Sequence, residues 1–234
     1  GEVELALLEH CIRDNLNYSA ERRLAVLKPL KVVIENFPEG KIEWLPALNN
    51  PNSDKQEQRE IPFSREIWIE EDDFMEEPSK KFFRLAPGKE VRLRYAFFVT
   101  CNAVIKDEDG EIVELRCSYD PETRGGNAPD GRKVKGTIHW VSAEHAKDAE
   151  VRVYNSFYNT PTPGRDRDFI EDINPNSLEV LKNCKIEPDL ITLDDNVPIQ
   201  FERLGYFYKD PDTTPEKHIY NRTISLRDTW NKKP

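Results

Sequence analysis

Several short stretches of this chain alternate apolar and polar residues with a period of two, and this pattern limits the possible folds most. In 91–100, 112–119 and 133–142, apolar side chains occupy every second position, as in half-buried β-strands. Shorter stretches with strand character lie at 30–36, 42–45, 66–69, 151–157 and 199–208. Many short strands separated by glycine- and proline-rich turns indicate a barrel or a sandwich. We therefore expect an all-β fold, and at 234 residues two small β-barrels fit better than one large barrel.

Turn and helix signals divide these strands. Asp109-Gly110 separates two apolar stretches, so residues 101–119 are predicted to form a β-hairpin. Residues 160–164 are predicted to form a loop, and 169–173 a short helix. Residues 2–16 carry the only long helical pattern, in which leucine and isoleucine recur at three- and four-residue steps. We expect a short N-terminal helix that packs against another element.

The sequence lacks the motifs of the common enzyme classes. It contains no phosphate-binding P-loop, no nucleophile elbow and no zinc-protease helix. The four cysteines and four histidines are scattered without metal-ligand spacing, so no metal site and no catalytic residue are predicted. No apolar stretch approaches the length of about 20 residues that crosses a bilayer, and the N-terminus lacks signal-peptide features. These observations favour a cytoplasmic binding module.

Charge is distributed unevenly along the chain. The net charge is −10, which by itself argues against a polyanionic partner. Between Glu66 and Glu77 there are seven acidic residues and no basic residue, whereas Ser79 to Arg94 holds six basic residues against Glu90 alone. This segregation allows a local cationic surface, and nucleic acid therefore remains a possible partner.

Four stretches of the sequence resemble glutaminyl-tRNA synthetases, a family of class I aminoacyl-tRNA synthetases. They occur in the family's order and cover most of the chain: Arg22–Val26 with Pro29–Ile34, Ile61–Ile69, Gly131–Ser142, and Gln200–Phe207 followed by Asn221–Thr223. The resemblance is to the C-terminal anticodon-binding region of these enzymes. The strand that ends in His139-Trp140 is also similar to archaeal- and eukaryotic-type glutamyl-tRNA synthetases.

The resemblance implies a domain arrangement. Residues 1–20 would be the remnant of a helical connector, residues 21–76 with 190–234 a proximal β-barrel, and residues 77–189 an inserted distal β-barrel. The parent enzyme would attach glutamine to its tRNA with ATP and magnesium. This chain carries none of the ATP-site signatures, so it should hold no cofactor, lack the catalytic domain and be inactive alone.

The resemblance also implies which side chains read the anticodon. Arg92 and Arg94 match contacts to the first base, and they would stand roughly 6.6 Å apart on one rigid strand at about 3.3 Å per residue. Arg84 matches the arginine for the third base. Arg22 and Gln200, with Arg203 close by, match the site of the middle base, where the glutamine amide offers both a donor and an acceptor. Arg23 would replace Arg22 if the register slips by one residue.

Further positions are matched less strongly. Asn17 and Asn52 correspond to contacts beside the anticodon, and Thr229 lies in a stretch that resembles a signalling path to the catalytic domain. Lys80 and Lys81 are expected to neutralise phosphates rather than read bases. Phe83 departs from the family pattern, because some relatives carry a basic side chain there.

The expected partners are the anticodon loop of glutamine tRNAs and the catalytic domain of the same protein, with a monomer as the expected state. Two alternatives stay open. One is the anticodon-binding region of a glutamyl-tRNA synthetase, and the other is a non-enzymatic RNA-binding β-barrel like those of ribosomal proteins.

Overall fold

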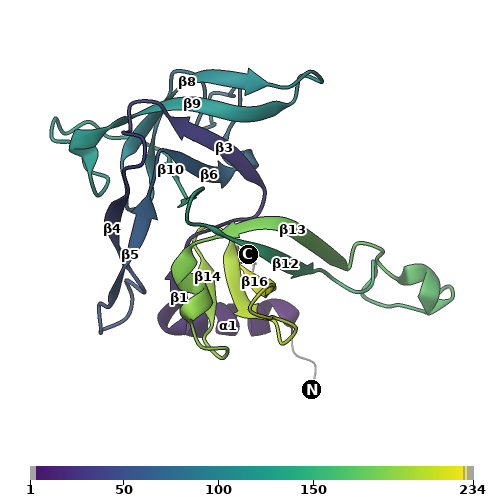
Figure 1. Cartoon of the computed structure of the whole chain (residues 1–234). Coiled ribbons are helices and arrows are strands. Elements are labelled where there is room, and N and C mark those ends of the chain that lie inside the picture. The colour runs from purple at the N-terminus through teal and green to yellow at the C-terminus, as the bar shows by residue number, and fades with distance from the viewer. Residues whose placement is uncertain (1–3, 229, 231–234) are drawn as a thin grey trace.

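A computed structural model describes residues 4–228 and 230, and it contains two nearly closed β-barrels (Figure 1). The upper barrel in Figure 1 is a seven-stranded sheet in the order β10-β7-β8-β9-β3-β6-β11. Its strands are β3 (Pro29–Ile34), β6 (Glu66–Glu70), β7 (Glu90–Leu93), β8 (Phe98–Lys106), β9 (Ile112–Asp120), β10 (Thr137–Ile138) and β11 (Trp140–Ser142). The expected all-β fold with two barrels is therefore confirmed.

The lower barrel is a second seven-stranded sheet, in the order β1-β14-β15-β16-β12-β13-β2. Its strands are β1 (Glu21–Arg23), β2 (Ala25–Val26), β12 (Lys147–Tyr154), β13 (Leu178–Ile186), β14 (Ile199–Phe201), β15 (Gly205–Lys209) and β16 (His218–Ser225). The pairs β1–β14 and β12–β16 are parallel, and the remaining pairs are antiparallel. The described residues also contain four 3-10 turns: η1 (Glu71–Asp73), η2 (Pro121–Thr123), η3 (Phe169–Asp172) and η4 (Pro188–Thr192).

Each barrel is closed by one extended segment that is interrupted at a single residue. In the upper barrel, β10 and β11 form the two edges of the sheet and are separated by His139. In the lower barrel, β1 and β2 are separated by Leu24. The chain then crosses between the barrels twice by short links, 27–28 before β3 and 143–146 before β12. The first link is fixed by Glu70, which accepts the Leu27 and Lys28 N–H groups at 2.7 and 3.0 Å.

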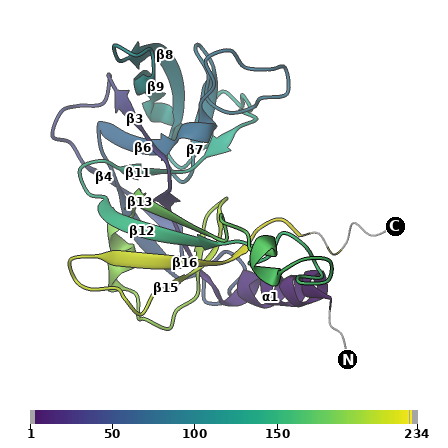
Figure 2. The same ribbon diagram turned by 90° about the vertical axis from the view of Figure 1, so that its right-hand side faces the viewer.

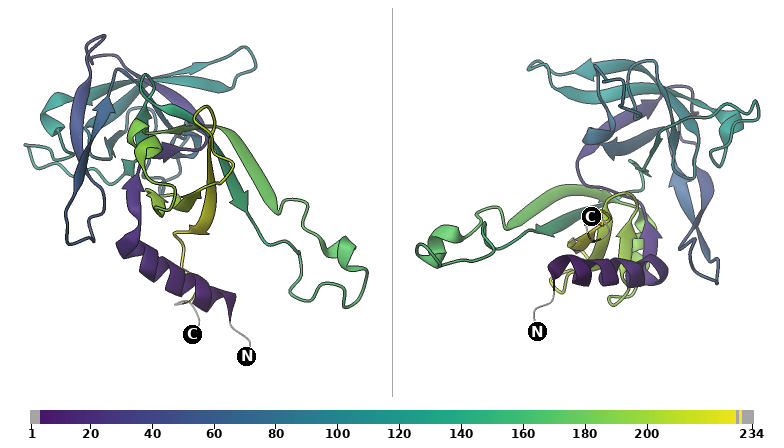
Figure 3. Two further views of the ribbon diagram at one scale, coloured as in Figure 1. Left: turned by 60° about the horizontal axis from the view of Figure 1, so that its bottom comes forward. Right: turned by 180° about the vertical axis from the view of Figure 1, so that it is seen from behind.

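Three elements project from or cover the barrels. The ribbon of β4 (Glu43–Leu48) and β5 (Gln58–Phe63) extends from the upper barrel beside the lower one (Figure 1). Helix α1 (Leu5–Ser19) lies alongside the lower barrel (Figure 2), and Ile12 and Leu16 pack against Ala20, Tyr206 and Ile224. Beyond β12 and β13 the chain forms a long arm that carries η3 and points away from both barrels (Figure 3). In the described part of the chain, α1 included, no helix is long and apolar enough to cross a membrane.

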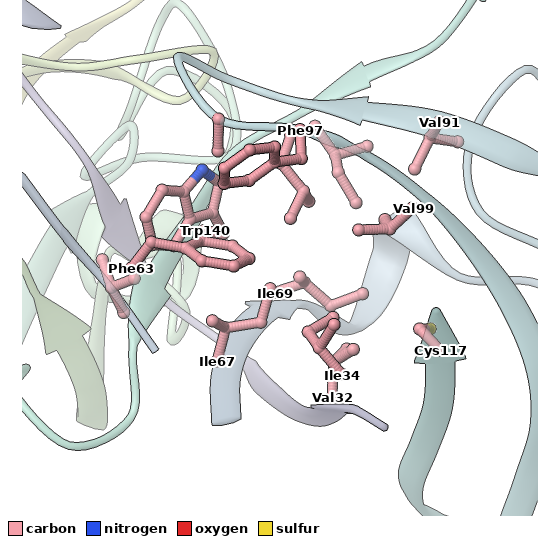
Figure 4. Close-up of a cluster of buried hydrophobic side chains, with 14 of the residues drawn as sticks. Val32, Ile34, Phe63, Ile67, Ile69, Val91, Phe97, Val99, Cys117 and Trp140 are labelled. Atoms are coloured by element: carbon pink, nitrogen blue, oxygen red, sulfur yellow. The ribbon is translucent and has the colours of Figure 1, made fainter. Parts of the chain in front are cut away.

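The core of the upper barrel is formed by the inward-facing residues of its strands (Figure 4). Trp140, Phe63 and Phe97 are almost completely buried, and the Phe63 ring lies 5.1 Å from both of the other two. Burial of such large apolar side chains supplies about 1.5–3 kcal/mol each relative to exposure. The lower barrel has a smaller core of its own, in which Phe201 and Phe207 stack at 4.2 Å.

The local predictions succeed unevenly. The hairpin at Asp109-Gly110 is confirmed by the pairing of β8 with β9, and Gly110 has a positive φ of 85°. The helix runs over Leu5–Ser19, three residues further than the predicted end at residue 16, and the predicted positions 2 and 3 lie outside the described residues. The predicted strand 91–100 is wrong as one element, because the chain turns at Tyr95, which has a φ of 65°. The stretch 199–208 is likewise split at Arg203, with a φ of 69°, and 133–142 is extended only from residue 137 onward.

The sheets also group the segments differently from the expected domain boundaries. β3 and β6, expected in the proximal barrel with residues 190–234, pair with β9 and β11 of the upper barrel. β12 and β13, expected in the inserted barrel, pair with β16 and β2 of the lower barrel. The insertion therefore lies between β2 and β12. The expected boundaries differ from this grouping because β1 and β2 are only a few residues long, so the sequence gives little sign that the chain passes to the other sheet after β2.

Candidate nucleic-acid interface

The parallel pairing of β1 with β14 places Arg22 directly beside Gln200. The Arg22 guanidinium donates to Gln200 Oε1 at 2.5 Å and to Asn17 Oδ1 at 3.3 Å. The Asn52 amide donates to the same Asn17 oxygen at 3.0 Å. Four of the residues predicted to contact RNA thus form one hydrogen-bonded cluster, which we call the Arg22 cluster: Asn17, Arg22, Asn52 and Gln200.

The end of helix α1 positions this cluster. Asn50 is buried, and its side-chain amide donates to the carbonyl oxygens of Tyr18 and Ala20 at 3.0 Å, where the helix leaves its last carbonyls without helical partners. Asn17 is held on the last turn as a result. A hollow of about 330 Å³ opens beside the cluster and is lined by Asn17 and Gln200 together with His10, Arg13, Asp14, Tyr206, Leu226 and Asp228.

The alternative residue, Arg23, points into the protein. Its side chain is 2% exposed and donates to Asp189 at 2.9 Å and to Glu21 at 3.0 Å. These carboxylates occupy the guanidinium, so Arg23 stabilises the lower barrel and is not accessible to a ligand.

A second group of predicted residues meets where the two barrels touch. Asp73, in η1 of the upper barrel, accepts both Nη atoms of Arg203 at 2.6 and 2.8 Å from the lower barrel. Arg84 Nε lies 3.3 Å from the same carboxylate, and its Nη1 donates to the Asp72 carbonyl at 2.8 Å. Arg203 also donates to His139 Nδ1 at 2.9 Å. Asp73 therefore joins Arg84 and Arg203 through one buried carboxylate.

A second buried carboxylate, Glu202, makes the reverse connection from the lower barrel to the upper. Arg94 Nε lies 2.7 Å from Glu202 Oε2, and the Tyr95 hydroxyl donates to Glu202 Oε1. Burial and the nearby Glu202 carboxylate raise the pKa of Tyr95 to about 12, so the phenol remains protonated. Burial alone would lower the pKa of Arg94, but the charge of Glu202 raises it. The guanidinium therefore remains charged while it is partly enclosed.

Arg92 and Arg94 do not share one strand, contrary to the expectation. Arg92 lies on β7, where its guanidinium stacks over the Phe98 ring at 5.5 Å, whereas Arg94 lies in the turn that follows. Arg92 also fits against Gly126, because a Cβ at that position would meet its side chain at 2.9 Å. The two guanidiniums are thus held by different partners, one by a ring and one by a carboxylate.

The remaining predicted residues lie on the surface or outside the described residues. Lys80 and Lys81 are exposed in the loop between η1 and β7. Thr229 lies outside the described residues. The sequence reasoning missed Asp73, Glu202 and Tyr95. Asp73 is one of seven acidic residues between 66 and 77, and no local feature separates it from its neighbours.

The fold and the interface define a two-barrel binding module in which polar and cationic side chains of both barrels are linked through two buried carboxylates. Residues 20–120 match the family described as tRNA synthetases class I (E and Q), anti-codon binding domain, and residues 137–210 match a second family with the same description. The chain therefore belongs to the anticodon-binding region of the class I synthetases of the E and Q type.

The curated relatives support this assignment. A glutamine–tRNA ligase of Bradyrhizobium diazoefficiens is 58% identical over 230 residues, which is 98% of this chain and 41% of the relative. Glutamine–tRNA ligases of Nitrobacter winogradskyi and Aliivibrio fischeri are 55% and 52% identical, over 98% and 97% of this chain and 41% of each relative. The chain spans about two fifths of the length of these relatives.

Proposed function

We propose that this chain binds the anticodon loop of glutamine tRNAs, as part of a cytoplasmic enzyme that attaches glutamine to tRNA with ATP and magnesium. The single observation that carries the proposal is the physical linkage of the predicted side chains. Gln200 joins Arg22 on the lower barrel, and two positions later along the same chain segment Glu202 joins Arg94 of the upper barrel. In this proposal, one trinucleotide contacts all of these groups.

The Arg22 cluster suits the middle base of the anticodon. Sequence-specific RNA recognition uses unstacked loop bases, whose edges are read by side chains in pockets. The Gln200 amide can donate to and accept from the edge of a uracil, and Arg22 holds that amide in one orientation at 2.5 Å. Asn17 and Asn52, on the same cluster, would contact the nucleotides that flank the anticodon.

The arginines of the upper barrel and of its contact with the lower barrel suit the outer bases. A guanidinium offers a planar fork of donors, which suits guanine in particular. In this proposal Arg84 reads the third base, Arg92 and Arg94 contact the first base, and Arg203 supports Arg84 through their common partner Asp73. Lys80 and Lys81 would neutralise phosphates on the loop. The protein is proposed to act as a monomer with its own catalytic domain.

The relatives favour glutamine over the alternatives. The matching family includes both E and Q enzymes, but the relatives named above are all glutamine–tRNA ligases. The family match disfavours a ribosomal-protein-like module. Glutamine and glutamate anticodons differ in the third base, so the contact proposed for Arg84 is the one that would distinguish them.

Binding to anticodon stem-loops at fixed salt tests the proposal. Wild-type chain should prefer the glutamine stem-loop over one in which only the third base is changed to that of glutamate. Arg22→Ala and Arg84→Ala should each weaken binding by about 1–3 kcal/mol. Arg116→Ala is a matched control, because this strand arginine is partly exposed and, among the described residues, forms an ion pair with Glu114 alone, at 2.6 Å. Equal binding of both stem-loops, with no loss in either variant, would disprove the assignment.

A further inference from the structure

A second hollow, of about 280 Å³, lies on the upper barrel away from the Arg22 cluster. It is lined by Phe82, Phe83, Arg84, Lys89, Glu90, Lys133, Val134, Lys135 and Gly136. Phe83 is the most prominent apolar group in it, with 51% of its surface exposed. An aromatic ring in this position, beside four cations and one acid, is not explained by packing.

The backbone holds Phe83 in place. A Cβ on Gly136 would lie 1.9 Å from the Phe83 carbonyl oxygen, so the two backbones can approach only because residue 136 is glycine. The Lys135 ammonium lies 5.0 Å from the centre of the Phe83 ring. Gly136 continues directly into β10, whose pairing with β7 connects the hollow to the sheet. The backbone of Phe83 is thus held close to the start of β10, and its half-exposed ring lies beside Lys135.

The lysines around Phe83 lack acidic partners. Within residues 4–228 and 230, no carboxylate lies within ion-pairing distance of Lys89, Lys133 or Lys135. Arg132, next in sequence, behaves differently, because it pairs with Glu90, Asp120 and Asp130. Unpaired ammonium groups beside an open aromatic face are the combination that binds single-stranded nucleic acid.

We propose that Phe83 is a base-stacking residue for the anticodon base that Arg84 reads, and that Lys133 and Lys135 neutralise the neighbouring phosphates. This inference rests on the proposed function and adds to it a stacking face and a phosphate site. Stacking holds any base against the ring, whereas Arg84 discriminates between bases through hydrogen bonds. Phe83 therefore contributes affinity, and Arg84 contributes specificity.

The first test measures the affinity of the whole chain for the glutamine anticodon stem-loop by fluorescence anisotropy. Phe83→Ala should weaken binding roughly 5- to 150-fold, the range of one lost base–aromatic stack. Phe83→Trp should retain binding, because indole also provides a stacking face. Phe169→Ala is the matched control, since Phe169 is 54% exposed and lies in η3 on the arm rather than on the upper barrel, so its loss should change nothing.

A stem-loop lacking the third anticodon base separates stacking from general loss of structure. Wild type and Phe83→Ala should bind this abasic stem-loop equally, because no base is left to stack. If Phe83→Ala weakens both stem-loops to the same degree, or neither, the stacking role is refuted. If wild type fails to prefer the glutamine anticodon at all, the proposed function fails as well. Normal preference with an unaffected Phe83→Ala variant removes only the stacking role.

The phosphate site is tested through the salt dependence of binding. Lys133→Ala and Lys135→Ala should each reduce the slope of log K against log salt by about 0.7, the value for one phosphate contact on a single strand. Lys182→Ala, an exposed lysine on β13 of the other barrel, should leave the slope unchanged. Slopes that match wild type in both variants would remove the two lysines from the site.

Discussion

Replacement of Glu187 by glutamine should destabilise the protein strongly. Arg59 on β5 donates to both oxygens of Glu187, and Glu187 also accepts the Leu24 N–H at 2.9 Å. Arg23 Nε lies 3.4 Å from the same carboxylate. One carboxylate at the end of β13 therefore holds the β4–β5 ribbon and the interrupted strand of the lower barrel together.

The magnitude follows from burial. The side chains of Glu187, Arg59 and Arg23 are 3%, 5% and 2% exposed, so water cannot replace the lost charge. Burial alone would lower the pKa of Arg59, but Glu187 raises it, so neutralising Glu187 leaves a buried guanidinium without the charge that compensates its burial. Removal of one member of a buried pair costs about 3–5 kcal/mol. With about 2–4 °C per kcal/mol for a chain of this size, Tm should fall by roughly 6–20 °C.

Urea and thermal unfolding followed by circular dichroism measure this change. Glu39→Gln, at an exposed glutamate, is the control and should unfold like wild type. The double variant Arg59→Met with Glu187→Leu should recover part of the loss, because it leaves one fewer buried charge unpaired. A Glu187→Gln variant within about 1 kcal/mol of wild type would refute the reasoning.

Two further predictions concern titration. Because the pKa of Tyr95 is raised in the folded state, its contribution to stability is present below pH of about 10 and is lost as the pH rises toward about 12. Tyr95→Phe should therefore reduce the dependence of stability on pH in that window. A pH profile of unfolding that matches wild type would contradict the assignment. The hydrogen bond from His10 and the backbone N–H of Trp230 lower the pKa of Asp228, so its contribution is present above pH of about 4 and is lost on acidification. Asp228→Asn should therefore reduce the acid dependence of Tm, measured by calorimetry, and an acid limb as steep as that of wild type would argue against it.

The fold class was predictable from the sequence because alternation and turns are local signals. Asp109-Gly110 and the leucines of α1 needed no knowledge of the rest of the chain. The breaks within the stretches 91–100 and 199–208 were not predictable, because Tyr95 and Arg203 adopt positive φ without being glycine. A tight turn with buried residues on both sides preserves the apolar–polar alternation, so the sequence across the turn has the pattern of one continuous strand. The sequence also did not predict which strands share a sheet, since parallel pairs such as β12–β16 join segments that are far apart in sequence.

For the candidate site, too, some features were predictable from the sequence and others were not. The residues matched by resemblance include two separate groups in the structure, the Arg22 cluster and the arginines at the junction of the barrels, Arg84, Arg94 and Arg203. Their carboxylate partners were missed, because an acidic residue shows its partner only after folding. Tyr95 and Arg203, the two non-glycine residues that break the strands, also contact Glu202 and Asp73 at the junction. Uncommon backbone conformations are often found at functional positions, where the surrounding structure stabilises them.

The two short crossings between the barrels fix the separation of their binding groups. A single connection would act as a hinge and let one barrel rotate relative to the other. A second connection only a few residues long restricts this rotation. The distance between Gln200 and Arg84 is then fixed by the fold. Under the proposed function, an RNA loop whose bases are spaced differently would have to deform to engage both groups, and the protein would then select for the geometry of the loop as well as for its sequence.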